Sequence, residues 1–335
     1  MEKNLIRAAD DIMRAAQLAA ALEVSGWPKP GNIHRTADFK DTTFEHYIAG
    51  SIAIGPAMRE AALQGIRAAL KEIQIREVGI GRSIKNAVKE VKAWHKGGNT
   101  HLGVTLLFVP LAAAAGYTYT IHGKMELESL RGNSKKIMES STPQDAVEAF
   151  KAINMATPAA LGRMKGFEAP DLTDRDADKT IIGQEISLHE TMEVASSWDG
   201  LAYEWTSGMS VSFKLGYPTF KRIFEETKDI NTATVHTFLT ILSHHPDTFI
   251  ARKIGAKETE DARGAVEIGM EVARAISDRA LKVLELGGLL TEKGRAALSE
   301  LDDCLRRPRN ELNPGTTADL TAASLMIAIL CGFRP

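Results

Sequence analysis

The chain has 335 residues, 44% of them hydrophobic and 25% charged, which is ordinary for a globular protein and enough to bury a sizeable core. Its formal net charge of −2, without a block of like charges, argues against general binding to nucleic acid or to an anionic membrane. Cys304 and Cys331 are too few for a disulfide framework and lack the spacing of a zinc site, so we expect a cytoplasmic protein.

Helical periodicity runs through the chain, and no series of alternating strands competes with it. The first 23 residues predict an amphipathic helix whose acidic residues argue against a secretory signal. Thr42 and Glu45 form a capping-box pattern that predicts a long helix to about residue 73, kinked near Pro56. Another helix is expected over 83–95.

Residues 102–121 carry no charge and are long enough to span a membrane. Alanines, threonines, two glycines and Pro110 make the run weakly hydrophobic, and no second candidate accompanies it. We therefore predict a buried central helix and no membrane association.

The rest of the chain predicts further helices separated by polar breaks. A polar connection is expected over 122–141, and Thr142–Pro143 and Thr157–Pro158 each have the pattern of a helix start. The polar segment 166–183 predicts a loop that is either a mobile lid or plain solvated surface. Helices are then expected over 187–203, 217–228, 232–243, 259–286, 291–307 and from about 316 to 331. Without a repeat or a clear linker, the simplest architecture is a single all-α domain, 1–335.

The segment 23–41, EVSGWPKPGNIHRTADFKD, interrupts the helices with two prolines, two glycines and several reactive side chains. The prolines fix φ and Gly31 permits a positive φ, so the turn is expected to be rigid. A rigid turn can hold reactive groups in place, although a structural corner with solvated charges is the alternative. The candidate residues are Glu23, Lys29, His34, Arg35, Asp38 and Asp41.

Two further segments place polar groups at helix starts, where free backbone N–H groups favour anions. GGNTHLG, residues 97–103, precedes the apolar helix and offers Asn99, Thr100, His101 and Gly103. NPGTTADL, residues 313–320, offers Gly315 and Thr316, with Thr316 or Thr317 expected as the cap and Asp319 in the first turn. Simple capping, with a satisfied core histidine, is the alternative for both.

HHPDTFIARK, residues 244–253, contributes Asp247 for a metal or a proton and Arg252 for phosphate. Its adjacent histidines point in different directions, so they are expected to be helix-end residues and not joint metal ligands. Asp302-Asp303 followed by Arg306-Arg307 is similar to the aspartate-rich element of prenyl-transferring enzymes, but a charged helix face explains it better.

Taken in order, EVSGWPKPGNIHR, the following D-F-x-D, GGNTHLG, HHPDTFIARK and NPGTTADL resemble the motifs of the triphosphoribosyl-dephospho-CoA synthase family. The resemblance implies an all-helical fold and a Mg²⁺-dependent reaction of ATP with dephospho-CoA. In it, the ribose 2′-hydroxyl of dephospho-CoA attacks the anomeric carbon of ATP's ribose, adenine leaves, and the triphosphate is kept. The product is a precursor of the prosthetic group of citrate lyase or malonate decarboxylase acyl carriers.

The resemblance also implies roles for the motif residues, because adenine departure builds oxocarbenium character that carboxylates stabilise. The residues expected to bind phosphate are Lys29, Arg35, Asn99, Thr100, Gly103, Arg252, Gly315 and Thr316. The residues expected to be catalytic are Glu23, His34, Asp38, Asp41 and His101. Asp247 and Asp319 are expected to bind magnesium.

The chain departs from the family pattern at three places. Bacterial members commonly have a basic residue where this chain has Leu102, a Gly-Gly-Ser-like element at 315–317, and Ser-His at 36–37. These differences leave the acceptor open, so pentosyl transfer in another cofactor pathway is one alternative. A metal-dependent nucleotide hydrolase or N-glycosidase, and a non-catalytic nucleotide-binding protein, are the others. Self-association of the chain also stays open.

Overall fold

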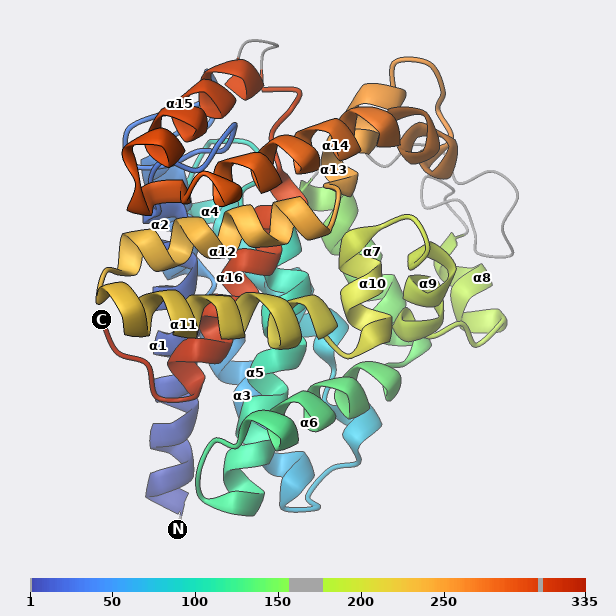
Figure 1. Cartoon of the computed structure of the whole chain (residues 1–335). Coiled ribbons are helices and arrows are strands. Elements are labelled where there is room, and N and C mark those ends of the chain that lie inside the picture. The colour runs from blue at the N-terminus through green and yellow to red at the C-terminus, as the bar shows by residue number, and fades with distance from the viewer. Residues whose placement is uncertain (1, 157–176, 307–309) are drawn as a thin grey trace.

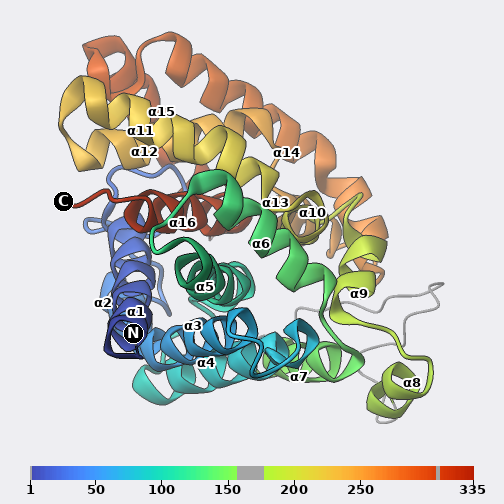
Figure 2. The same cartoon turned by 90° about the horizontal axis from the view of Figure 1, so that it is seen from below.

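Helix α5 (Leu102–His122) is the centre of the molecule, and the computed structural model describes residues 2–156, 177–306 and 310–335 around it. In Figure 2, α5 is seen end-on, with α1 (Glu2–Ser25), α3 (Gly55–Ala69), α6 (Leu127–Glu139) and α16 (Gly315–Leu330) around it. Within the described ranges, α5 alone is long and apolar enough to cross a membrane, and 78% of its most apolar window is buried. The predicted buried central helix is confirmed.

Small residues explain how closely α3 and α5 approach. Gly65 of α3 faces the Ala113 carbonyl, and Gly116 of α5 faces the Ala62 carbonyl. A Cβ at either glycine would collide with that backbone. The small residues of α5 therefore let it pack tightly in a protein core.

A second group of helices covers the other side of α16 (Figures 1 and 2). It consists of α11 (Tyr217–Thr227), α12 (Ile230–His244), α13 (Thr248–Gly255), α14 (Ala262–Glu285) and α15 (Glu292–Arg306). Apolar side chains of α12, α13, α14 and α15 form their own cluster, which includes Phe238, Ile250 and Leu301. The larger cluster surrounds α5. The α16 helix contacts both groups, so its N-terminal end lies between them.

The remaining helices are α2 (Phe44–Ala53), α4 (Ile80–Trp94), α7 (Pro143–Ala156), α8 (Ala177–Gly183), α9 (Leu188–Ala195) and α10 (Gly200–Ser207). Short elements are Ile75–Glu77 and Gly288–Leu290, which are 3₁₀ turns, and Ser212–Gly216, which is π-helical. Regular structure in the described ranges is helical, apart from an isolated bridge between His34 and Ala37. The predicted all-α class is confirmed.

Several predicted boundaries were wrong. The helix expected over 42–73 is two helices that divide at Ile54, and the polar connection at 122–141 contains α6. The helix expected over 187–203 is interrupted before Gly200, and α13 was not predicted. Thr157–Pro158 and 166–176 of the predicted loop lie outside the described residues, while Ala177–Gly183 forms α8.

Candidate active site

Four helices begin around one cavity, and α1 ends beside it. The starts of α5, α10, α13 and α16 supply most of the wall, with Tyr47 of α2 and Glu23 near the end of α1. Helix N-termini carry partial positive charge, so their convergence favours anionic groups. The cavity has a volume of about 130 Å³, less than the about 300–1,000 Å³ of typical small-molecule sites. A space of this size holds only part of a typical small-molecule ligand.

The sequence-predicted residues that line this cavity come from four separate motifs. They are Glu23, Asn99, Thr100, His101, Gly103, Arg252, Gly315, Thr316 and Asp319. Lys29 and Asp247 lie directly behind the wall, each close enough to act electrostatically on Asp319. The fold thus gathers segments separated by up to about 290 residues into one site, which makes its chemistry testable residue by residue.

Asp319 lies in the second turn of α16, not the first as predicted, and its carboxylate faces the start of α5. A Cβ on Gly103 would collide with that carboxylate. The backbone N–H of Val104 bonds to Asp319 and favours its ionised form. The N-terminus of α5, expected to bind a phosphate, therefore already faces a carboxyl group of the protein itself.

Neighbouring negative charge opposes that ionisation. Burial, first, and then the carboxylates of Glu23 and Asp247 raise the pKa of Asp319 well above its ordinary value. Asp199 adds to the effect. Burial and these neighbouring carboxylates consequently favour the protonated form of Asp319 when the cavity holds no cation.

Asp247 connects α13 to α16. Its Oδ1 accepts hydrogen bonds from the backbone N–H groups of Phe249 (3.0 Å) and Ile250 (3.1 Å). Its Oδ2 accepts from the backbone N–H of Thr317 (2.7 Å) and from the Thr317 hydroxyl (2.8 Å). Both oxygens are thus occupied, and Thr317 bonds to this carboxylate instead of capping its own helix. The geometry suits a structural clamp better than a direct metal ligand.

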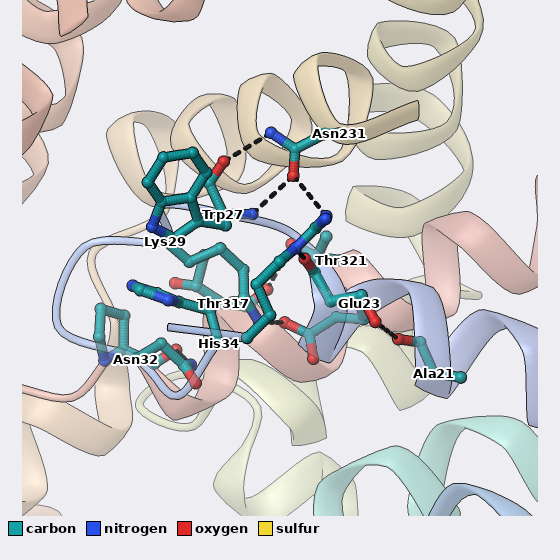
Figure 3. A network of polar contacts seen from close by, with 12 residues as sticks. Ala21, Glu23, Trp27, Lys29, Asn32, His34, Asn231, Thr317 and Thr321 are labelled. Carbon is teal, nitrogen blue, oxygen red and sulfur yellow. Dashed lines mark hydrogen bonds and ion pairs between the residues drawn. The ribbon is translucent and has the colours of Figure 1, made fainter. Parts of the chain in front are cut away.

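Glu23 and Lys29 form a buried ion pair beside the cavity (Figure 3). Lys29 is fully buried, and its ammonium donates to Glu23 Oε1. Burial raises the pKa of Glu23, and the Lys29 charge opposes that rise. Burial lowers the pKa of Lys29. Glu23 lines the cavity, whereas Lys29, predicted to bind phosphate, lies behind the wall and is paired with Glu23.

The 97–103 segment is held by its own polar contacts. Asn99 Oδ1 accepts from the Leu102 N–H (3.1 Å), as a capping residue would. The Thr100 hydroxyl bonds to His101 Nδ1 (2.7 Å) and to His95 Nε2 (3.0 Å). Burial, with a smaller effect of His95, lowers the pKa of His101 to about 3, so this imidazole is neutral at ordinary pH.

Arg252 lines the cavity between Asp199 and Phe249. Its Nη1 lies 3.9 Å from Asp199 Oδ2, and its guanidinium carbon lies 5.7 Å from the centre of the Phe249 ring. Asp199 Oδ1 caps α10 by accepting from Leu201 and Ala202. The Arg252 guanidinium keeps free donors for an anionic ligand because the contact with Asp199 is long.

Four predicted site residues lie elsewhere. His34 is buried against α15, where Arg306 Nη2 donates to its Nε2 (2.9 Å) and Asp302 Oδ2 lies 3.6 Å away. Arg35 donates to the Ser25 carbonyl (2.6 Å) and to Asn231 (3.0 Å). Asp38 accepts from the Phe44 N–H (2.7 Å) at the start of α2, and Asp41 is exposed. None of these four side chains lines the cavity.

Sequence reasoning also missed residues of the wall. Tyr47, Asn32, Asp199 and Asn313 line the cavity, and burial with the nearby Glu23 and Asp319 charges raises the pKa of Tyr47. Asp199 precedes Gly200 at a helix start, a capping signal that the sequence did offer. Tyr47 lies within a helix and gave no such signal.

No group of three or more His, Cys, Asp or Glu side chains in the described part of the chain is arranged to hold a metal ion. The oxygens that the cavity offers include those of Asp319, the Oδ2 of Asp199 and the buried, unpartnered Oδ1 of Asn313. Carboxylates are the ligands that Mg²⁺ prefers, and Mg²⁺ commonly needs only one or two when phosphates supply the rest. The cavity therefore fits a magnesium ion that arrives with a phosphorylated ligand.

The sequence pattern of the CitG family, described as ATP:dephospho-CoA triphosphoribosyl transferase, matches residues 9–334. The 2-(5''-triphosphoribosyl)-3'-dephosphocoenzyme-A synthase of Klebsiella pneumoniae is 24% identical over 325 residues, which are 96% of this chain and 91% of that protein. The enzyme of the same name from Escherichia fergusonii is 24% identical over 323 residues, again 96% and 91%.

A solved structure agrees with the sequence relatives. The crystal structure of a candidate triphosphoribosyl-dephospho-CoA synthase from Archaeoglobus fulgidus superposes with a TM-score of 0.58 at 25% identity. The match covers 86% of this chain and all of that one. Family pattern, relatives and fold agree with the resemblance found in the motifs, and the chain belongs to the CitG family of ATP:dephospho-CoA triphosphoribosyl transferases.

Proposed function

We propose that this protein transfers the triphosphoribosyl group of ATP to the ribose 2′-hydroxyl of dephospho-CoA, with release of adenine. The observation that carries the proposal is the single cavity at which helix N-termini, the three carboxylates of Glu23, Asp199 and Asp319, and Arg252 meet. Helix N-termini and a guanidinium suit a polyphosphate, and carboxylates suit the positive charge that develops on the ribose as adenine departs.

Electrostatics supports MgATP as the form of the substrate. The carboxylates of Glu23, Asp319, Asp199 and Asp247 surround the cavity, and each one that is ionised would repel a bare triphosphate. Magnesium bound to the triphosphate neutralises part of the phosphate charge and so weakens that repulsion. Asp319 and Asp199 are the residues we propose to face the ion.

Arg252 and the start of α16 are proposed to bind the phosphates, with the Thr316 N–H as a donor, because its neighbours at Gly315 and Thr317 are already bonded to Asn313 and Asp247. Arg252 reaches the cavity from α13, which Asp247 ties to α16 through Thr317, so both elements are held in register. The ribose then lies deeper, beside Glu23 and the Gly103 end of α5. His101, being neutral, is proposed to orient groups by hydrogen bonding and not to act as a cationic acid.

The proposal is tested by incubating the purified protein with ATP, magnesium and dephospho-CoA and by following adenine chromatographically. Adenine release that requires both magnesium and dephospho-CoA is expected. Release of ribose triphosphate without an acceptor would indicate an N-glycosidase instead, and release of phosphate would indicate a nucleotide hydrolase. Omission of dephospho-CoA is the matched control.

A further inference from the structure

Lys29 is enclosed by four elements of the fold. Its ammonium donates to Glu23 on α1 and lies 5.8 Å from the centre of the Phe238 ring on α12. Charges on α15 and α16 act on it as well, since Arg306 lowers its pKa and Asp319 raises it. With no exposed surface, Lys29 cannot reach a phosphate in the cavity unless Glu23 moves aside.

The loop that carries Lys29 is fixed on both sides. Asn231 of α12 accepts from the Trp27 N–H (2.8 Å) and donates to the Trp27 carbonyl, as Figure 3 shows. Asp302 of α15 accepts from the Gly31 N–H (2.7 Å), and Arg306 donates to the Asn32 carbonyl. These anchors hold the Lys29 backbone in place, so its ammonium presents a stationary partner to Glu23.

Glu23 is the member of the pair that meets the cavity. Tyr47 from α2 and Asp319 from α16 face it there, and Lys29 faces it from the loop. Of these three groups, Lys29 alone favours the ionised form of Glu23. An ionised carboxylate with a fixed cation behind it is suited to take a proton from a hydroxyl in front of it.

We propose that Lys29 is a positioning residue that aims the Glu23 carboxylate into the cavity as the base for the attacking hydroxyl, and that it does not bind the triphosphate. This rests on the proposed function. As the hydroxyl oxygen bonds to the anomeric carbon, its proton passes to Glu23. The electron pair of the breaking bond between that carbon and N9 leaves with adenine, which takes up a proton from water and departs neutral, and Glu23 then returns its proton to water.

The test is a double-mutant cycle of Glu23→Gln, Lys29→Met and the combined variant, with kcat, KM for ATP and the pH dependence of adenine release. Glu23→Gln should lower kcat by about 10²–10⁴-fold, the usual contribution of a general base. Lys29→Met alone should lower kcat at neutral pH with little change in KM. The acid limb of the pH profile of this variant should move to higher pH, because Glu23 then loses the cation that favours its ionised form.

Lys29→Met in the Glu23→Gln background should change kcat by less than about twofold, because Lys29 then has no base to position. If Lys29→Met alone does not fold, the kcat of the combined variant can still be compared with that of Glu23→Gln. Neither of these two proteins contains an unpaired Glu23 charge, so the comparison still tests whether Lys29 acts through Glu23. Arg35→Met is the matched control, because it removes a cation from the same loop without touching Glu23, and its acid limb should not move.

Two results would overturn the inference. One is a rise in the KM for ATP in Lys29→Met with kcat and pH profile unchanged, which is the behaviour of a phosphate ligand. The other is a loss in the combined variant equal to the product of the two single losses. Both results can be observed only if the wild-type protein releases adenine. If the wild type releases no adenine, the proposed function is refuted, and not the role of Lys29.

Discussion

Replacing Gly103 with alanine tests the position of Asp319 at the start of α5. The new Cβ would collide with the Asp319 carboxylate, and the buried surroundings of α5 prevent an easy backbone shift. Overpacking of this kind costs about 1–3 kcal/mol of unfolding free energy. For 335 residues the unfolding entropy is about 0.7 kcal/mol/K, so Tm should fall by about 1–4 °C. Displacement of Asp319 should also lower kcat/KM by about 10²-fold.

Gly132→Ala is the matched control. Gly132 lies within α6, and a Cβ added there would meet nothing within 4 Å, so alanine should stabilise the protein by about 0.4–1 kcal/mol. Calorimetry of both variants, with adenine release measured on the same preparations, separates a general glycine effect from the specific collision. A Gly103→Ala protein with wild-type Tm and wild-type kcat/KM would refute the placement of Asp319.

Three further predictions concern charges and caps. The folded pKa of His101, about 3, lies below its unfolded value of about 6.5, so the folded state binds fewer protons between these two pH values. As pH falls through that window, His101 lowers the unfolding free energy by about 1.4 kcal/mol per pH unit. Denaturant unfolding at several pH values should therefore show a weaker fall of the unfolding free energy with decreasing pH in His101→Asn than in the wild type. Because Asp319 must lose a proton to face a cation, the apparent magnesium affinity in the adenine assay should rise with pH, and a pH-independent affinity would contradict this. Asp247→Ala should lower the unfolding free energy by about 0.5–2 kcal/mol, because the cap of α13 is lost. Asp247→Asn should leave the magnesium dependence of adenine release unchanged, and a large change in that dependence would show that Asp247 is a magnesium ligand.

The sequence predicted the helical class because apolar residues recur at helical spacing and because turn residues separate the segments. It did not predict α6, whose composition is largely polar and whose middle contains Gly132. It also missed α13, which has only eight residues and directly follows His245 and Pro246. Short or polar helices owe their stability to tertiary packing, which periodicity in one segment does not report.

The motifs pointed to the correct helix ends but not to the direction of each side chain. Lys29, His34 and Arg35 share one loop, yet one faces the core, one faces α15 and one faces α12. These directions depend on Asn231 and Asp302, which lie about 200 and 270 residues further along the chain. Local sequence therefore located the loop, while distant partners hold its charged side chains away from the cavity wall.

The reaction itself is the central claim, and mass spectrometry of the products from ATP, magnesium and dephospho-CoA tests it most directly. We expect adenine together with a dephospho-CoA product that has gained the ribose and all three phosphates of ATP. Adenine accompanied by free ribose triphosphate, or a dephospho-CoA product that carries fewer phosphates, would contradict it.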